Sequence, residues 1–175
     1  MDVVRKLQEA QHNLDLMRKE ETRGIGERRF ADYHSAFLSA SSSVIDGVEK
    51  QGDAAIAAKF KAWKDALTSE QKDLCDFMRK DRNQEVHGSG SRRSVKVEKS
   101  PVLGSYEDPA GGGTVQVFSA PQTLGYPPPL PIIEKHEHTV NIGGADRKVL
   151  EACSDYLGLL RKMVDHCSNA TGSPR

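Results

Sequence analysis

The feature that most constrains the fold of this chain is a set of apolar stripes that recur at the spacing of an α-helix. The clearest stripe consists of Ile56, Phe60, Trp63 and Leu67, which are separated by four, three and four positions. This spacing places the side chains on one face of a helix, whereas a half-buried strand needs an apolar residue at every second position. A helix with one apolar face must cover that face against another element.

Four other segments carry stripes of the same kind, and the run SASSS at 39–43 lies inside one of them. Small residues there either let a neighbouring helix approach closely or mark a frayed segment. The breaks between stripes are RGIG at 23–26 and Gly52. Stripes that must pair with one another predict a helical bundle. The four sets are Val4, Leu7, Leu14 and Met17 within 2–22; Phe30, Tyr33, Phe37, Ala40, Val44 and Val48; Leu74, Phe77 and Met78; and Leu150, Cys153, Leu157, Leu160 and Val164.

Local signals set some of the helix boundaries. Thr68 and Gln71 have the spacing of a capping box, which indicates a helix start. The helix that begins there is expected to reach Arg82 and His87 before the chain turns to glycine and serine. The last helix is expected to begin near Asp146.

The span 88–145 differs from the rest because it holds most of the glycine and proline. Alternation of apolar and polar residues predicts strands at 94–98, 113–118 and 138–142. We expect a mainly α fold, a helical bundle with a small β-rich insertion before the last helix. The expected organisation is a single domain over 1–175, with a helical core at 2–87 and 146–167, the insertion at 88–145 and a disordered tail at 168–175.

Composition excludes some classes of protein. Hydrophobic residues make up 37% and charged residues 29% of the chain, as in folded globular proteins. Lys plus Arg and Asp plus Glu both number 25, which argues against a protein that coats nucleic acid. The three cysteines lack a Cys-x-x-Cys pair and are interpreted as reduced thiols. The charged N-terminus does not resemble a signal peptide, and no stretch approaches the roughly 20 apolar residues of a membrane span. A cytoplasmic protein without membrane contact is therefore expected.

The stretch DRNQEVH at 81–87 holds the residues best suited to chemistry. The guanidinium of Arg82 can bind a phosphate with two hydrogen bonds, and the imidazole of His87 can transfer protons near neutral pH. Asn83 can orient either group. Arg82 and His87 lie about 140° apart around an ideal helix, so they converge only if the last turn loosens.

Cleavage of RNA is the phosphate chemistry that arginine and histidine perform most readily without a metal. The ribose 2′-hydroxyl attacks the adjacent phosphate while a base, an acid and a cation assist. A two-fold homodimer would bring two copies of Arg82 and His87 together and supply both proton-transfer groups. Seven basic and three acidic residues between 79 and 99 give a local charge of +4. The residues expected to bind RNA are Arg79, Lys80, Arg92, Arg93 and Lys96.

The sequence Arg82-Asn83-Gln84-Glu85-Val86-His87 is similar to the Arg-x-x-x-x-His signature of the HEPN superfamily, in the form where a polar residue follows the arginine. The resemblance covers roughly 2–87 and 146–167. It implies a bundle of four or five helices with Arg82 and His87 as the catalytic pair and Asn83 as the polar helper. Many such proteins are dimeric, metal-independent ribonucleases, often toxins or antiphage effectors, and others are non-catalytic.

The resemblance also raises the question of an antitoxin or regulatory partner. In one toxin–antitoxin branch a tyrosine two residues after the histidine is modified, but Ser89 occupies that position here. Regulation by tyrosine modification is therefore not expected.

Other interpretations stay open. The residues Arg82 and His87 can form an ordinary solvated helix end, where His87 is favoured by the helix dipole. The chain can also be a non-catalytic interaction module that binds a partner protein or a nucleotide. His136 and His138 share one strand face and can bind a metal or help to bind RNA, but a polar strand face explains them as well. No cofactor and no metal are expected.

Overall fold

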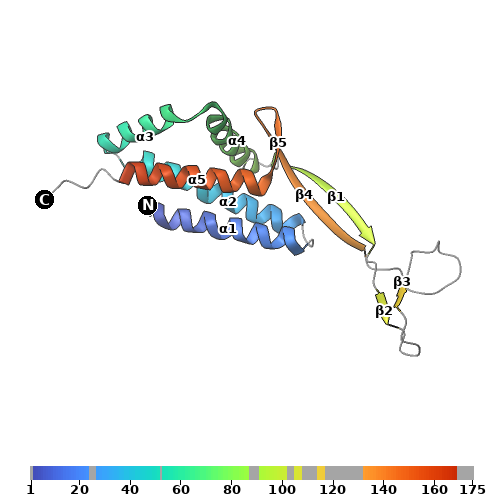
Figure 1. The fold of residues 1–175 in the computed structure, drawn as a ribbon. Coiled ribbons are helices and arrows are strands. Elements are labelled where there is room, and N and C mark those ends of the chain that lie inside the picture. Colours follow the sequence, from blue (N-terminus) through green and yellow to red (C-terminus); the bar gives the residue numbers. More distant parts are fainter. Residues whose placement is uncertain are drawn as a thin grey trace.

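A computed structural model describes residues 2–23, 27–51, 53–86, 91–101, 105–107, 114–116 and 132–168. Within these ranges the chain is mainly helical, with a small antiparallel sheet before the last helix, as expected (Figure 1). The helices are α1 Val3–Arg23, α2 Glu27–Glu49, α3 Ala54–Ala66, α4 Ser69–Val86 and α5 Val149–Ser168. The strands are β1 Ser94–Pro101, β2 Ser105–Glu107, β3 Thr114–Gln116, β4 Ile132–Ile142 and β5 Ala145–Lys148.

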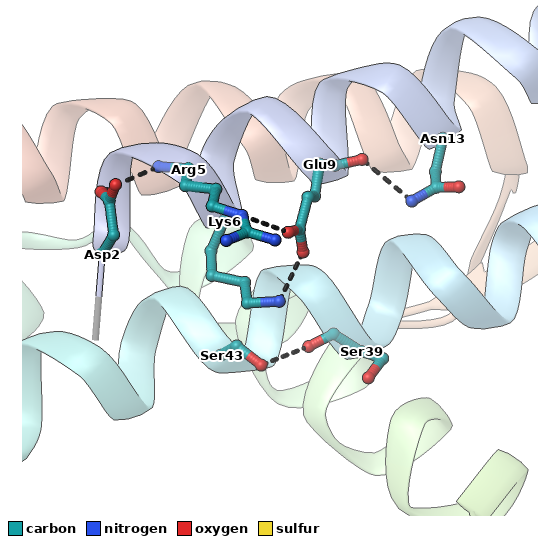
Figure 2. Close-up of polar contacts among 7 residues, drawn as sticks. All are labelled: Asp2, Arg5, Lys6, Glu9, Asn13, Ser39 and Ser43. Atoms are coloured by element: carbon teal, nitrogen blue, oxygen red, sulfur yellow. Dashed lines mark hydrogen bonds and ion pairs between the residues drawn. The ribbon is translucent and has the colours of Figure 1, made fainter.

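Polar contacts with near neighbours in sequence stabilise the start of α1 (Figure 2). Asp2 accepts a hydrogen bond from the backbone N–H of Arg5 at 3.1 Å, as an N-terminal cap does. Glu9 accepts from Arg5 Nε at 3.2 Å and from Lys6 Nζ at 2.5 Å. Solvent screens exposed pairs of this kind, so they contribute little to stability.

The serine-rich segment lies inside one unbroken helix, α2, so the alternative of a frayed segment is wrong. Ala40 and Ser41 are buried, which fits small residues at a close helix contact. Ser43 Oγ donates to the carbonyl oxygen of Ser39 at 3.0 Å, so this hydroxyl is satisfied within the helix (Figure 2).

Side-chain caps define the starts of α3 and α4. Asp53 accepts from the backbone N–H of Ala55 at 2.7 Å. The predicted capping box is confirmed: the N–H of Thr68 donates to Gln71 Oε1 at 3.0 Å, and the N–H of Gln71 donates to Thr68 Oγ1 at 3.3 Å. Each satisfies a donor that the helix itself leaves free.

The predicted stripes form one core, except that the prediction for Val4 is wrong: Val4 is 58% exposed, and Val3 lies in the core instead. Helices α1, α2 and α5 run side by side, and α3 and α4 cover them (Figure 1). Phe60 and Phe77 are buried, and the partly buried Trp63 packs against the same core and stacks on Phe60, as expected of core residues. Cys153 and Cys167 are buried free thiols and Cys75 is half-buried. Burial raises the pKa of the Cys75 thiol to about 11, which makes it unreactive at neutral pH.

The predicted strands at 94–98 and 138–142 lie within β1 and β4, which pair with each other. The sheet has the order β1-β4-β5, and its register places Val95 opposite His138 and Val97 opposite His136. A separate two-stranded sheet joins β2 to β3, which lies within the strand predicted at 113–118. The β1–β4 ribbon extends away from the helices (Figure 1).

The prediction that the last helix begins near Asp146 is wrong. Asp146 lies in β5, and α5 begins at Val149. Gly143 and Gly144 have φ of 60° and 88°, the left-handed pair that a two-residue hairpin turn requires. The chain therefore returns alongside β4, where Asn141 Nδ2 donates to Asp146 Oδ1 at 2.8 Å. The tail expected at 168–175 lies outside the described residues, apart from Ser168 at the end of α5.

Candidate functional site at the end of helix α4

Arg82 and Asn83 lie in the last turn of α4. Arg82 Nη1 donates to Asn83 Oδ1 at 3.3 Å, so the predicted helper contacts the predicted phosphate-binding group. Arg82 Nε is buried and has no hydrogen-bond partner among the described residues. Among the described residues no ion pair joins Arg82 to Asp81 or Glu85, and Arg82 is not among the charges that shift the pKa of either carboxyl. One edge of the guanidinium is thus uncommitted within the described chain.

His87 lies outside the described residues, which end at Val86 and resume at Ser91. The structure therefore does not place the second member of the predicted catalytic pair. It does place both ends of the intervening chain, Val86 on α4 and Ser91 before β1.

Asp81 connects these two ends. Its side chain is fully buried, Oδ1 accepts the backbone N–H of Arg92 at 2.6 Å, and both carboxylate oxygens lie within 3.2 Å of Ser91 Oγ. Burial raises the pKa of Asp81, and the Arg92 N–H and Ser91 hydroxyl act in the opposite direction. Asp81 therefore anchors the chain that enters β1 to the helix that carries Arg82.

Two buried histidines adjoin this anchor. His34 on α2 has Nε2 at 3.9 Å from Asp81 Oδ2, which is too long for a hydrogen bond. His138 on β4 stacks on Phe30 with ring centroids 3.7 Å apart and planes within 7°. Burial, assisted by the positive charge of Arg93, lowers the pKa of His34 to about 3 and that of His138 to about 4. Both rings are therefore neutral at pH 7.

Arg93 completes this buried group. Its side chain is only 12% exposed and its guanidinium lies 5.8 Å from the centre of the Phe30 ring, a cation–π distance. Its Nη2 lies 4.0 Å from Glu27 Oε1. Together with His34, Asp81 and His138, Arg93 forms a buried polar cluster that holds the root of the ribbon against α2 and α4.

The other residues expected to bind RNA lie on the surface. Arg79 Nη2 pairs with Asp76 at 3.3 Å, and Lys96 Nζ pairs with Glu98 at 2.9 Å. Lys80 is exposed, as is Arg92, whose Nε donates to Gln84. The five basic residues thus divide into four exposed ones and Arg93, whose side chain is mostly enclosed.

The histidines of β4 do not gather a metal site in the described part of the chain. His136 and His138 lie on one face with ring centroids 6.4 Å apart, as the alternation of a strand predicts. His138 is enclosed against Phe30, and no group of three His, Cys, Asp or Glu side chains with metal-binding geometry occurs among the described residues. Structural packing accounts for His138.

Sequence reasoning missed the buried polar cluster, although part of the signal was present. His34 lies four residues after Phe30 and three before Phe37, within an apolar stripe. Asp81 lies four residues after Phe77 on the buried face of α4. A polar residue at such a position is buried with a partner or a function.

Comparisons with protein-family models, with curated proteins and with solved structures each found no match to this chain. Among the described helices none is long and apolar enough to cross a membrane.

Proposed function

We propose that this protein is a metal-independent endoribonuclease of HEPN type that acts as a toxin or an antiphage effector. The observation that best supports the proposal is the state of Arg82. This guanidinium contacts Asn83, carries no described ion pair and keeps Nε without a partner. An arginine donor without a partner is costly, and an RNA phosphate oxygen would satisfy Nε if the half-buried Arg82 side chain turned outward on binding.

The proposed reaction needs no group outside the chain and the RNA. Arg82 binds the scissile phosphate, and His87 removes the proton from the ribose 2′-hydroxyl as that oxygen attacks phosphorus. The bond to the 5′-oxygen breaks, a second imidazole protonates this leaving oxygen, and a 2′,3′-cyclic phosphate remains. The second imidazole is the His87 of another copy in a two-fold homodimer, and Asn83 orients Arg82.

The second candidate is a non-catalytic HEPN-like module that binds a partner protein or a nucleotide. Two observations favour it. Arg93 is enclosed by Phe30 and Glu27 and does not face solvent as a phosphate-binding residue would. The exposed Arg79 and Lys96 both have acidic neighbours that reduce their attraction for a polyanion.

Expression in bacteria separates the two candidates. Wild type is compared with Arg82→Ala, His87→Ala and Lys72→Ala, the last being an exposed residue on the same helix. The endoribonuclease proposal predicts growth arrest and broken total RNA for wild type and Lys72→Ala, with both effects lost in the other two folded variants. Intact RNA with all four proteins folded and abundant favours the binding module.

A further inference from the structure

Strand β1 leaves one edge available for pairing. It hydrogen-bonds to β4 along its inner edge, and no other described strand pairs with its outer edge. An open edge presents unpaired N–H and C=O groups that accept another strand. A two-stranded ribbon is marginally stable by itself in water, so an added strand would stabilise it.

The sequence of this edge is complementary in charge about Val97, with serine at both ends and Val95 opposite Lys99. Residues 94–100 read SVKVEKS, so the positions flanking Val97 carry opposite charges, Lys96 and Glu98. We propose that the outer edge of β1 pairs antiparallel with the same edge of a second copy of this chain, with the two-fold axis at Val97. Lys96 of each copy then lies opposite Glu98 of the other.

Val97 supports this choice of axis. It is 42% exposed, one of two large apolar side chains that the described residues leave in solvent. In the proposed dimer it faces its own counterpart, and apolar β-branched side chains stabilise cross-strand contacts. Ser94 lies opposite Ser100, so the ends of the paired segment are polar in both copies.

The charges exclude the neighbouring registers. In an antiparallel pair, directly opposite side chains lie on the same face of the sheet, whereas neighbours along one strand lie on opposite faces. A two-fold axis between two copies of β1 must therefore pass through a residue that faces its own counterpart, and not between two residues. An axis at Lys96 sets two lysines against each other, and an axis at Glu98 sets two glutamates against each other. Each arrangement is repulsive. Of the axes at Lys96, Val97 and Glu98, only the one at Val97 places opposite charges against each other.

The other edge of the ribbon is less suited to the same contact. Strand β5 already occupies that edge of β4 from Thr139 to Ile142. A second copy of β4 centred near His136 would run into β5, because an antiparallel partner extends equally on both sides of the axis. The β1 edge has no such obstacle within the described chain.

RNA is a weaker candidate for this surface. Lys96 lies opposite Glu137 and Glu98 lies opposite Lys135 across the ribbon, so positive and negative charges alternate and balance. Binding of nucleic acid relies on an excess of positive charge. A balanced alternating pattern matches a second copy of itself better than it matches a polyanion.

The proposed contact joins two sheets into the order β5-β4-β1-β1-β4-β5. It is separate from the approach of two α4 ends in the proposed ribonuclease dimer. Arg92 is held at α4 by Asp81, and Val97 is five residues further along an extended strand, about 16 Å away. The inference therefore does not rest on the proposed function.

Sedimentation of charge variants tests the contact. Lys96→Glu and Glu98→Lys each place like charges opposite each other twice per dimer, so each protein alone should associate about tenfold or more weakly than wild type. In an equimolar mixture, the glutamate introduced at 96 meets the lysine introduced at 98 of the other protein. The mixture should therefore regain the mass of wild type. Lys61→Glu, on the exposed face of α3, is the control of equal charge change and should behave as wild type.

Three outcomes overturn the proposal. The first is that wild type sediments as a monomer up to millimolar concentration, which would leave no contact to explain. Either charge variant can keep the association constant of wild type, which places the contact elsewhere. The mixture can fail to associate beyond its separate components, which removes the charge pairing about Val97. Mixing leaves the effects of each substitution within its own ribbon unchanged, so recovery reports on the contact between copies.

Discussion

Replacement of Asp81 by alanine should destabilise the fold by about 2–4 kcal/mol. The carboxylate accepts the Arg92 N–H at 2.6 Å and contacts the Ser91 hydroxyl at 3.0 and 3.2 Å, in a site without solvent exposure. Its loss leaves two part-buried donors, the Ser91 hydroxyl and the Arg92 N–H, without their acceptor, at about 1–2 kcal/mol each. Part of this cost is offset because alanine removes a buried carboxylate. The burial of that charge is itself unfavourable and raises the pKa of Asp81.

Urea unfolding followed by circular dichroism gives the free energy of unfolding for this comparison. Asp81→Asn keeps an acceptor oxygen and should lose about half as much stability as Asp81→Ala. Asp76→Ala removes an exposed partner of Arg79 and should change stability by about 0.5 kcal/mol or less. If Asp81→Ala lowered the free energy of unfolding no more than Asp76→Ala does, the role of Asp81 as the anchor between α4 and β1 would be refuted.

Three further predictions concern the ribbon root and the helix caps. The folded-state pKa of His138 is near 4, below the usual 6.5, so the stability that neutral His138 contributes is complete above pH 6.5 and is lost as pH falls toward 4. Between pH 7 and pH 5 the free energy of unfolding of His138→Phe should therefore fall by about 1–2 kcal/mol less than that of wild type, as measured by urea titration. Gly143→Ala should lower the melting temperature and cost about 1 kcal/mol, because φ is 60° and the added methyl lies 3.1 Å from Asp73 Oδ2, whereas a cost near zero would contradict the left-handed turn. Thr68→Ala should cost about 0.5–2 kcal/mol by urea unfolding through loss of the bond to the Gln71 N–H, and an unchanged midpoint would show that the capping box does not hold α4.

The sequence predicted the helices because each one carries its own evidence. The spacing of Ile56, Phe60 and Trp63 is local and needs no knowledge of the partner helix. Strand β5 escaped prediction because Ala145–Lys148 is mostly polar and lacks apolar alternation. The pair Gly143–Gly144 was the available signal, since two adjacent glycines before a short polar segment favour a hairpin turn.

The surroundings of Arg82 were harder to predict because they depend on contacts between distant segments. Neither the spacing of Arg82 and Asn83 nor the local charge reveals that Asp81 binds Ser91 and Arg92. Arg93 looked like a surface cation, yet it lies against Phe30, 63 positions earlier in the chain. Local patterns report which side a residue faces, and the identity of its partner follows from tertiary packing.

The most direct test of the central proposal is the end chemistry of RNA treated with purified protein in EDTA. The proposal predicts fragments with 2′,3′-cyclic phosphate and 5′-hydroxyl ends from wild type and from Lys72→Ala, and intact RNA from Arg82→Ala and His87→Ala. Cleavage by His87→Ala at the rate of wild type would contradict the assignment of the proton-transfer group. The absence of cleavage by folded wild type over a broad set of RNAs would contradict the ribonuclease itself.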